Sequence, residues 1–215
     1  MTHCALDELL SYTQQHAEPI SRHLTDFIKA YFDKADPAEL QDRSPATLFA
    51  LANAHWRLLD GIRPSNTAKV RVFNPTLAED GFASEHTVVQ IVNDNMPFLV
   101  DSVTMAINRG NRTVHWIVHP LISVARDSNG KVQGISNAAA PASAHPDSVE
   151  SFILVECDRI VSRAERQALA AELERVLDDV RSAVQDWRPM MERAKAVAAE
   201  ASSPSLSPTG RQEGG

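Results

Sequence analysis

Two stretches of this chain carry apolar side chains on both faces of a β-strand, and they constrain the fold more than any other feature. In HTVVQIVN (86–93), Val and Ile point to both sides of the strand. The segment 151–160 carries Phe152, Ile153, Leu154 and Val155 in succession. Strands of this kind belong in the middle of a sheet, where both faces are covered. The sequence therefore predicts a sheet with these two segments as its core strands.

Helical spacing dominates the first sixty residues. Apolar residues recur at helical intervals over 3–31, where Pro19 is expected to interrupt the helix, and again over 48–59, ahead of a helix end at Gly61. Asp36-Pro37 and Ser44-Pro45 are typical of helix starts. KVRVF (69–73) then alternates as a strand does, and residues 76–85 are expected to form a loop.

Strand and helix patterns alternate in the remainder of the chain. Pro97 suits the first turn of a helix through Ile107, and Ser162 with Glu165 forms a capping box for a helix through Val184. Pro120 predicts a bulge or edge position in the β-branched run 113–126, which a hairpin turn at 127–130 follows. Residues 136–148 are expected to be a loose loop, and helix is expected to resume after Pro189.

These elements predict an α+β fold with helices on one face of a mainly antiparallel sheet. A ferredoxin-like βαββαβ sandwich fits if one further strand is present, and a small all-helical segment precedes it. We expect a helical leader over 1–62, an α+β domain over 68–186, a C-terminal helical extension over 187–200 and a disordered tail over 201–215.

Composition excludes several classes of function. The net charge is −7 and no run of Lys or Arg occurs, so nucleic acid is not an expected partner. The chain contains no stretch of about 18 apolar residues, so no membrane span is expected. The N-terminus lacks the features of a signal peptide. Cys4 and Cys157 are expected to be reduced thiols in a cytoplasmic protein. With 8 glycines and no Gly-rich phosphate loop, a nucleotide cofactor site is not expected in this chain.

Ionisable side chains outside such motifs offer few candidates for chemistry. His115 and His119 lie four residues apart, but no complete ligand set accompanies them, so no metal site is predicted. Glu150, Glu156 and Asp158 are expected on a solvated face rather than as a general acid and base.

The segment NDNMPFLVDS (93–102) is the strongest candidate site, because it leaves a core strand and enters a helix. The free N–H groups at a helix start suit a carboxylate ligand. The competing interpretation is that Asn93, Asp94 or Asn95 simply caps the helix.

Three long runs carry a resemblance to a known family: VRVFNP (70–75), HTVVQIVNDNMPFLVDSVTMAINR (86–109) and VHWIVHPLISVARDSNGKV (114–132). They resemble the N-terminal region of the large bacterial NAD-specific glutamate dehydrogenases. SRHLTDFIKAYFDKADPAELQDRSPATLFALANAHW (21–56), ESFILVECDRI (150–160) and VQDWRPMMERAKAVAAE (184–200) are similar to the same region. The resemblance thus covers about residues 20–200.

That resemblance implies an ACT-like module from a very long polypeptide that oxidises L-glutamate to 2-oxoglutarate with NAD. The family's catalytic lysine and Gly-rich NAD loop have no counterpart here, so this chain alone is not expected to catalyse the reaction or to hold a cofactor.

ACT modules commonly bind amino acids at the turn between first strand and first helix, often across a dimer interface. The resemblance carries this role to a tentative effector turn. Asn95 stands where Asp is usual, and Phe98 stands where Gly is usual and could fill the pocket. This departure favours a role in packing or assembly. The turn comprises Asn93, Asp94, Asn95, Met96, Pro97, Phe98, Asp101 and Ser102.

Two functions are therefore expected from sequence. The first is a non-catalytic regulatory and assembly module, which would self-associate or contact the dehydrogenase catalytic region. The second is a stand-alone amino-acid sensor. Because SSPSLSPTGRQEGG (202–215) does not resemble the family, a truncated or partial product is expected.

Overall fold

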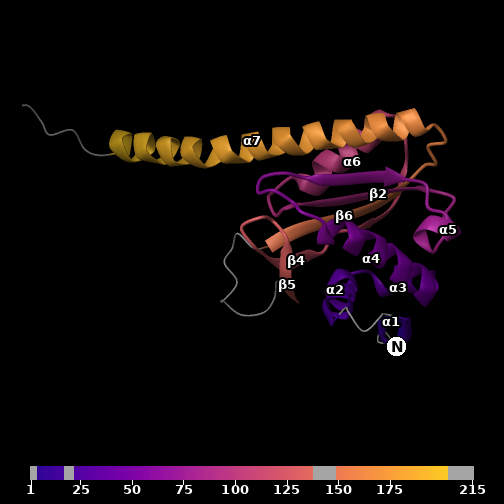
Figure 1. The fold of residues 1–215 in the computed structure, drawn as a ribbon. Helices are drawn as coiled ribbons and strands as arrows, with labels where there is room; N and C mark the ends of the chain where they lie inside the picture. The colour runs from indigo at the N-terminus through magenta and orange to yellow at the C-terminus, as the bar shows by residue number, and fades with distance from the viewer. Residues whose placement is uncertain (1–3, 17–21, 138–148, 203–215) are drawn as a thin grey trace, which may run out of the picture.

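A six-stranded antiparallel sheet lies at the centre of the computed structural model, which describes residues 4–16, 22–137 and 149–202 (Figure 1). The strand order is β1-β2-β6-β4-β5, and β3 also pairs with β6. The strands are β1 (Lys69–Phe73), β2 (Thr87–Asp94), β3 (Val114–Val118), β4 (Leu121–Arg126), β5 (Val132–Asn137) and β6 (Val149–Cys157). The helices are α1 (Cys4–His16), α2 (Arg22–Phe32), α3 (Pro37–Gln41), α4 (Pro45–Asp60), α5 (Leu77–Asp80), α6 (Leu99–Arg109) and α7 (Arg163–Ser202).

The two predicted core strands, β2 and β6, lie side by side in the middle of the sheet. They pair over eight positions, from Thr87 opposite Cys157 to Asp94 opposite Glu150. Every residue of β2 before Asp94 is buried, which confirms the prediction of a central strand. β6 begins two residues earlier and ends three residues earlier than the expected 151–160.

The remaining strands complete a ferredoxin-like sheet in an unexpected chain order. In the βαββαβ plan, a strand after the second helix would add beside the first strand. Here β1, which precedes that first strand, pairs antiparallel with β2 and fills this edge. β3 and β4 pair with successive parts of β6, and the interruption falls at His119 and Pro120, as Pro120 predicted. The predicted hairpin turn joins β4 to β5.

Helices cover both faces of the sheet, so the expectation of helices on one face is wrong. Val88, Val92, Phe152 and Leu154 belong to a core with the N-terminal helices. Val89, Ile91, Ile153 and Val155 form a second core with α6 and α7. The reason lies in the strands themselves: side chains alternate between faces, and both faces of β2 and β6 are apolar. Each face therefore needs its own covering layer.

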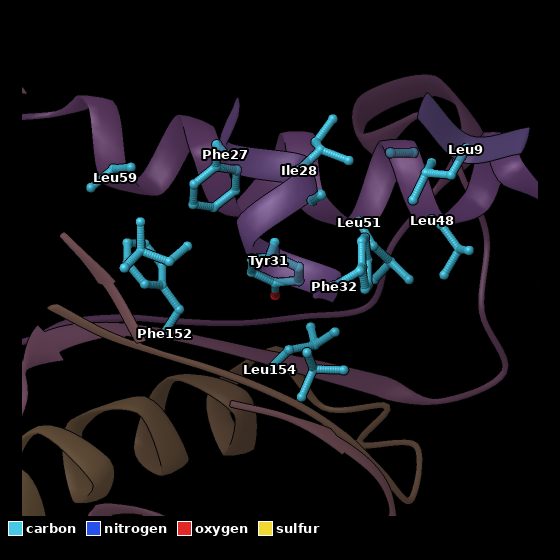
Figure 2. Close-up of a cluster of buried hydrophobic side chains, with 14 of the residues drawn as sticks. Leu9, Phe27, Ile28, Tyr31, Phe32, Leu48, Leu51, Leu59, Phe152 and Leu154 are labelled. Atoms are coloured by element: carbon cyan, nitrogen blue, oxygen red, sulfur yellow. The ribbon is translucent and has the colours of Figure 1, made fainter. Parts of the chain in front are cut away.

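The N-terminal helical segment is a structural layer of the sheet (Figure 2). Phe27 of α2 packs edge-on against Phe152 of β6, with ring centroids 5.3 Å apart. Leu9, Ile28 and Leu51 are fully buried in the same cluster. The predicted leader over 1–62 thus shares one hydrophobic core with the strands.

A buried histidine joins this helical layer to the sheet. His55 of α4 is fully buried, and its Nε2 lies 3.0 Å from the carbonyl oxygen of Ile91 in β2. Because that carbonyl can only accept, Nε2 carries the proton and Nδ1 accepts the hydroxyl hydrogen of Tyr31, 2.8 Å away in α2. One neutral imidazole therefore connects α2, α4 and β2, and burial lowers its pKa to about 3.

Three helix starts agree with the sequence prediction, but two other local features do not. Asp36 and Ser44 cap α3 and α4, as predicted. Ser162 Oγ accepts the Glu165 N–H, which is one of the two bonds of the predicted capping box. The expected loop 76–85 contains α5. The expected interruption at Pro189 does not occur, because α7 continues unbroken to Ser202. Pro19, residues 138–148 of the expected loop and 203–215 of the expected tail lie outside the described residues.

We predict that His55 makes the protein acid-sensitive. The folded-state pKa, about 3, lies below the unfolded value near 6.5, so the unfolded state binds the proton first as pH falls. The free energy of unfolding should fall by about 1.4 kcal/mol per pH unit between these limits. Urea titrations at several pH values in this range should show that the free energy of unfolding depends less steeply on pH in His55→Gln. An equal pH dependence in both proteins would contradict the assignment.

Candidate functional site

The predicted effector turn joins β2 to α6 without a side-chain cap. Phe98 is the N-cap residue of α6, and its φ of 69° is in the left-handed region that favours Gly. Pro97 precedes the helix instead of lying in its first turn, and no side chain of the N-cap bonds the helix. Asn93 and Asp94 belong to β2. The capping interpretation is therefore wrong, because the polar residues lie in the strand or outside the helix start.

The eight residues of this turn do not gather around one cavity. Asn93 is buried toward α7 and Asp94 lies on the opposite face, because neighbouring residues of a strand alternate. Met96 packs against the core beneath α6 and α7. The Phe98 ring is 66% exposed, so it does not fill a pocket of this chain as expected. The others are exposed or half-buried: Asn95, Pro97, Asp101 and Ser102.

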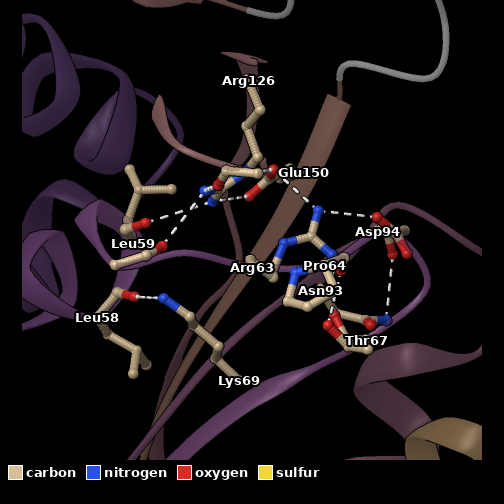
Figure 3. A network of polar contacts seen from close by, with 12 residues as sticks. Leu58, Leu59, Arg63, Pro64, Thr67, Lys69, Asn93, Asp94, Arg126 and Glu150 are labelled. Atoms are coloured by element: carbon tan, nitrogen blue, oxygen red, sulfur yellow. Dashed lines mark hydrogen bonds and ion pairs between the residues drawn. The ribbon is translucent and has the colours of Figure 1, made fainter. Parts of the chain in front are cut away.

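A buried ion-pair cluster lies where β2 ends, on the face covered by the N-terminal helices (Figure 3). We call Arg63, Asp94, Arg126 and Glu150 the arginine–carboxylate cluster. Arg63 Nη2 donates to Asp94 Oδ1 and Glu150 Oε1, each at 2.8 Å. Arg126 binds Glu150 through two nitrogens, at 2.6 and 3.0 Å. Glu150 is 3% exposed, so one buried carboxylate holds two guanidinium groups.

The cluster fixes the linker between α4 and β1 onto the sheet. Arg63 belongs to this linker, and its backbone N–H donates to the carbonyl oxygen of Gly130 in the β4–β5 turn. Arg126 Nη1 donates to the same carbonyl oxygen at 2.8 Å. Burial disfavours the charge of Arg63, but hydrogen bonds and attraction from Glu150 and Asp94 outweigh it and raise its pKa. The pKa of Lys69 is lowered by burial and by the charges of Arg126 and Arg63.

A cavity of about 670 Å³ opens beside the cluster. Guanidinium and carboxylate groups both line it, so the lining offers donors and acceptors of both charges. Such a lining suits a small polar ligand that carries both charges. Of the eight predicted turn residues, Asp94 lines it. The lining residues are Arg63, Pro64, Ser65, Asp94, Val124, Ala125, Arg126, Asp127, Ser128, Asn129, Gly130 and Glu150.

Helix α7 reaches the same end of β2 from the other face of the sheet. Arg181 Nη2 donates to Asn93 Oδ1 at 2.6 Å and lies 3.8 Å from Asp94 Oδ2. Its Nη1 donates to Asp178 at 2.7 Å. The Asp94 carboxylate therefore lies between Arg63 of the linker and Arg181 of α7, and it connects the two helical layers.

The acidic residues of β6 are not on a solvated face, contrary to expectation. Glu150 and Glu156 are buried, and Glu156 accepts from Arg43 at 2.6 Å. The arginines come from distant segments and neutralise them, a pairing that buried carboxylates require. Asp158, just after β6, is half-buried, binds His115 at 2.7 Å and has a pKa lowered by the Thr113 N–H and by His115.

Other candidate groups are occupied in structural contacts. His119 Nε2 lies 2.7 Å from Ser151 Oγ, so the two candidate histidines bind different partners. Within residues 4–16, 22–137 and 149–202, no group of three or more potential ligands could hold a metal ion. Cys157 is a buried free thiol, and burial raises its pKa to about 11. None of the described helices combines the length and apolarity needed to cross a bilayer.

Comparison with known proteins gives a consistent result over most of the chain. Residues 27–173 match the family model "Glutamate dehydrogenase, ACT1 domain". This chain belongs to that family. An NAD-specific glutamate dehydrogenase of Halomonas elongata is 34% identical over 174 residues, and one of Pseudomonas aeruginosa is 30% identical over 194 residues.

This chain spans about a tenth of the length of these relatives. The alignments include 81% and 86% of this chain, but only 11% and 12% of the two dehydrogenases. The resemblance seen in the sequence is therefore confirmed for an N-terminal ACT1 region. Sequence reasoning missed the arginine–carboxylate cluster of this ACT1 domain, because Arg63 and Glu150 are 87 positions apart and no local pattern links them.

We predict that Gly130→Ala destabilises the ACT1 domain by loosening the linker. Gly130 has a φ of 80°, and an added Cβ would lie 2.4 Å from the carbonyl oxygen of Arg63. The free energy of unfolding should fall by about 2–3 kcal/mol. Gly134→Ala is the matched control, since no atom lies within 4 Å of its added Cβ. Equal denaturation midpoints for the two variants would refute the assigned contact.

Proposed function

We propose that this chain is a non-catalytic regulatory and assembly module of an NAD-specific glutamate dehydrogenase. The observation that supports this most directly is the ACT1 domain match over residues 27–173, in a chain that aligns with only 11% and 12% of two such dehydrogenases. In this proposal, L-glutamate is oxidised to 2-oxoglutarate elsewhere in the dehydrogenase, where NAD binds. The module acts in amino-acid metabolism in the cytoplasm, without nucleic acid or membrane partners.

Contacts at the end of β2 supply a physical route for regulation. Asp94 faces Arg63 of the linker on one side and Arg181 of α7 on the other, so a displacement of the linker or of α7 changes its electrostatic surroundings. Coupling requires two arrangements that a partner or ligand binds with different affinity. The partner in this proposal is another copy of the module or the catalytic region of the dehydrogenase.

The proposal predicts that the chain affects a dehydrogenase but does not replace it. The purified chain should form no NADH from glutamate and NAD. Removal of the matching segment from the Halomonas elongata relative should change its assembly size or its glutamate saturation curve, and addition of the segment as a separate chain should reverse the change. Light scattering and initial rates measure the two effects. Turnover by the chain alone, or a deletion without effect on either property, would contradict the proposal.

A second candidate function is amino-acid sensing, and the cavity beside the arginine–carboxylate cluster favours it. A zwitterionic amino acid carries one carboxylate and one ammonium group, and the cavity lining presents both guanidinium and carboxylate groups. The free N–H groups at the start of α6 offer a competing position, near Asp101 and Ser102.

Calorimetry with amino acids, glutamate first, distinguishes these positions. If the cavity binds the ligand, Asp94→Asn should weaken affinity about tenfold by removing one charge, a loss near 1.4 kcal/mol. Asp101→Asn, the matched isosteric control at the helix start, should leave affinity unchanged. The reverse pattern would assign binding to the effector turn, and absence of heat across the amino acids would exclude the sensor.

A further inference from the structure

The C-terminal half of α7 extends beyond the rest of the molecule (Figure 1). Earlier in this helix, Leu169, Leu173 and Leu177 are buried in the core beneath α6 and α7. From 185 to 198, every side chain that the structure describes is exposed. This single helix of 40 residues therefore packs against the sheet in its first half, whereas residues 185–187 and 189–197 of its second half are exposed.

The apolar pattern of α7 does not change where the support ends. Leu173, Val180, Trp187 and Ala194 recur every seven residues, and so do Leu169, Val176, Ala183, Met190 and Val197. A pattern of this kind keeps its apolar residues on one side of a helix. We call the exposed part the distal stripe: Trp187, Met190, Met191, Ala194 and Val197. Trp187, Met190 and Val197 are 60%, 62% and 64% exposed.

Pro189 weakens the distal half of α7. Pro189 lacks an N–H group, so one hydrogen bond of the helix is missing at this point. Packing of its apolar face against a partner would supply the missing stabilisation.

We infer that the distal stripe is a self-association surface, which binds the distal stripe of a second copy in antiparallel orientation. This inference rests on the assembly role proposed above and names its partner. A two-fold axis between the helices places the same patch on both sides of the interface. Trp and Met side chains are enriched in such interfaces.

Charge complementarity selects the antiparallel orientation and its register. When Trp187 of one copy lies opposite Met190 of the other, Ala183 faces Ala194 and Val184 faces Met191 across the axis. The same register places Asp186 beside Arg193 of the second copy, on both sides of the stripe by symmetry. Asp186 and Arg193 occupy the same heptad position, directly before the seam residues Trp187 and Ala194. In an antiparallel pair of helices, residues at this flanking position lie opposite each other, so the two opposite charges meet. In a parallel pair, Arg193 would instead face Ala198.

Sedimentation of the full chain tests the surface. We expect a concentration-dependent dimer, and Met190→Glu should raise its dissociation constant at least tenfold, since it places a carboxylate in the stripe. Ala196→Glu introduces the same side chain on the opposite side of the helix and should leave the constant unchanged. A chain that is monomeric at all accessible concentrations, or equal constants for the two variants, would overturn the inference.

Two further measurements test the orientation, in a background in which Cys4 is replaced by Ser. A mixture of Ala183→Cys and Ala194→Cys chains should form a mixed disulfide, whereas Ala194→Cys alone should not. Asp186→Arg should weaken dimerisation, and Asp186→Arg with Arg193→Asp should restore it. Efficient self-linking of Ala194→Cys would show a parallel pair and overturn the proposed arrangement.

These outcomes are separable from those of the proposed function. If the chain is a monomer but the segment still restores the assembly of the dehydrogenase, the partner of the distal stripe is another part of that enzyme. In that case the self-association surface is wrong and the regulatory module stands. If the chain dimerises through the stripe without effect on the dehydrogenase, the module is wrong and the surface stands.

Discussion

The structure depends on one constraint: its central strand pair is apolar on both faces. β2 and β6 cannot expose either side to water without losing the burial of several Val, Ile, Leu and Phe side chains. The N-terminal helices cover one face, and α6 with α7 cover the other. The segment that sequence alone presents as a leader is thus required for the sheet, since its removal would uncover Phe152 and Leu154.

Polar groups within these layers determine how the layers are positioned. His55 bonds both Tyr31 and Ile91, which fixes α2 and α4 relative to β2 at one point in an otherwise apolar contact. The arginine–carboxylate cluster does the same at the end of the strand. Buried ion pairs contribute little net stability compared with apolar packing, because desolvation offsets their attraction. Their effect here is geometric: they join the linker, the hairpin and the last residues of β2.

Much of the fold was predictable from sequence, and most of the site was not. Local rules were sufficient where neighbours along the chain decide the structure, as at Asp36-Pro37, Ser44-Pro45 and the hairpin ending at Gly130. They failed where distant residues meet. Glu150 and Glu156 resemble surface carboxylates until Arg63, Arg126 and Arg43 are brought beside them. The start of α6 also misled, because Phe98 adopts a conformation that favours Gly.

The position of β1 has a consequence for the order in which this domain can form. Because β1 precedes β2 and fills the sheet edge beside it, all described strands have been synthesised once the chain reaches Cys157. Pairing of the described strands requires no segment after α7. Helix α7 therefore does not lead into a further strand of the described sheet, and its distal half is available for contacts outside this domain.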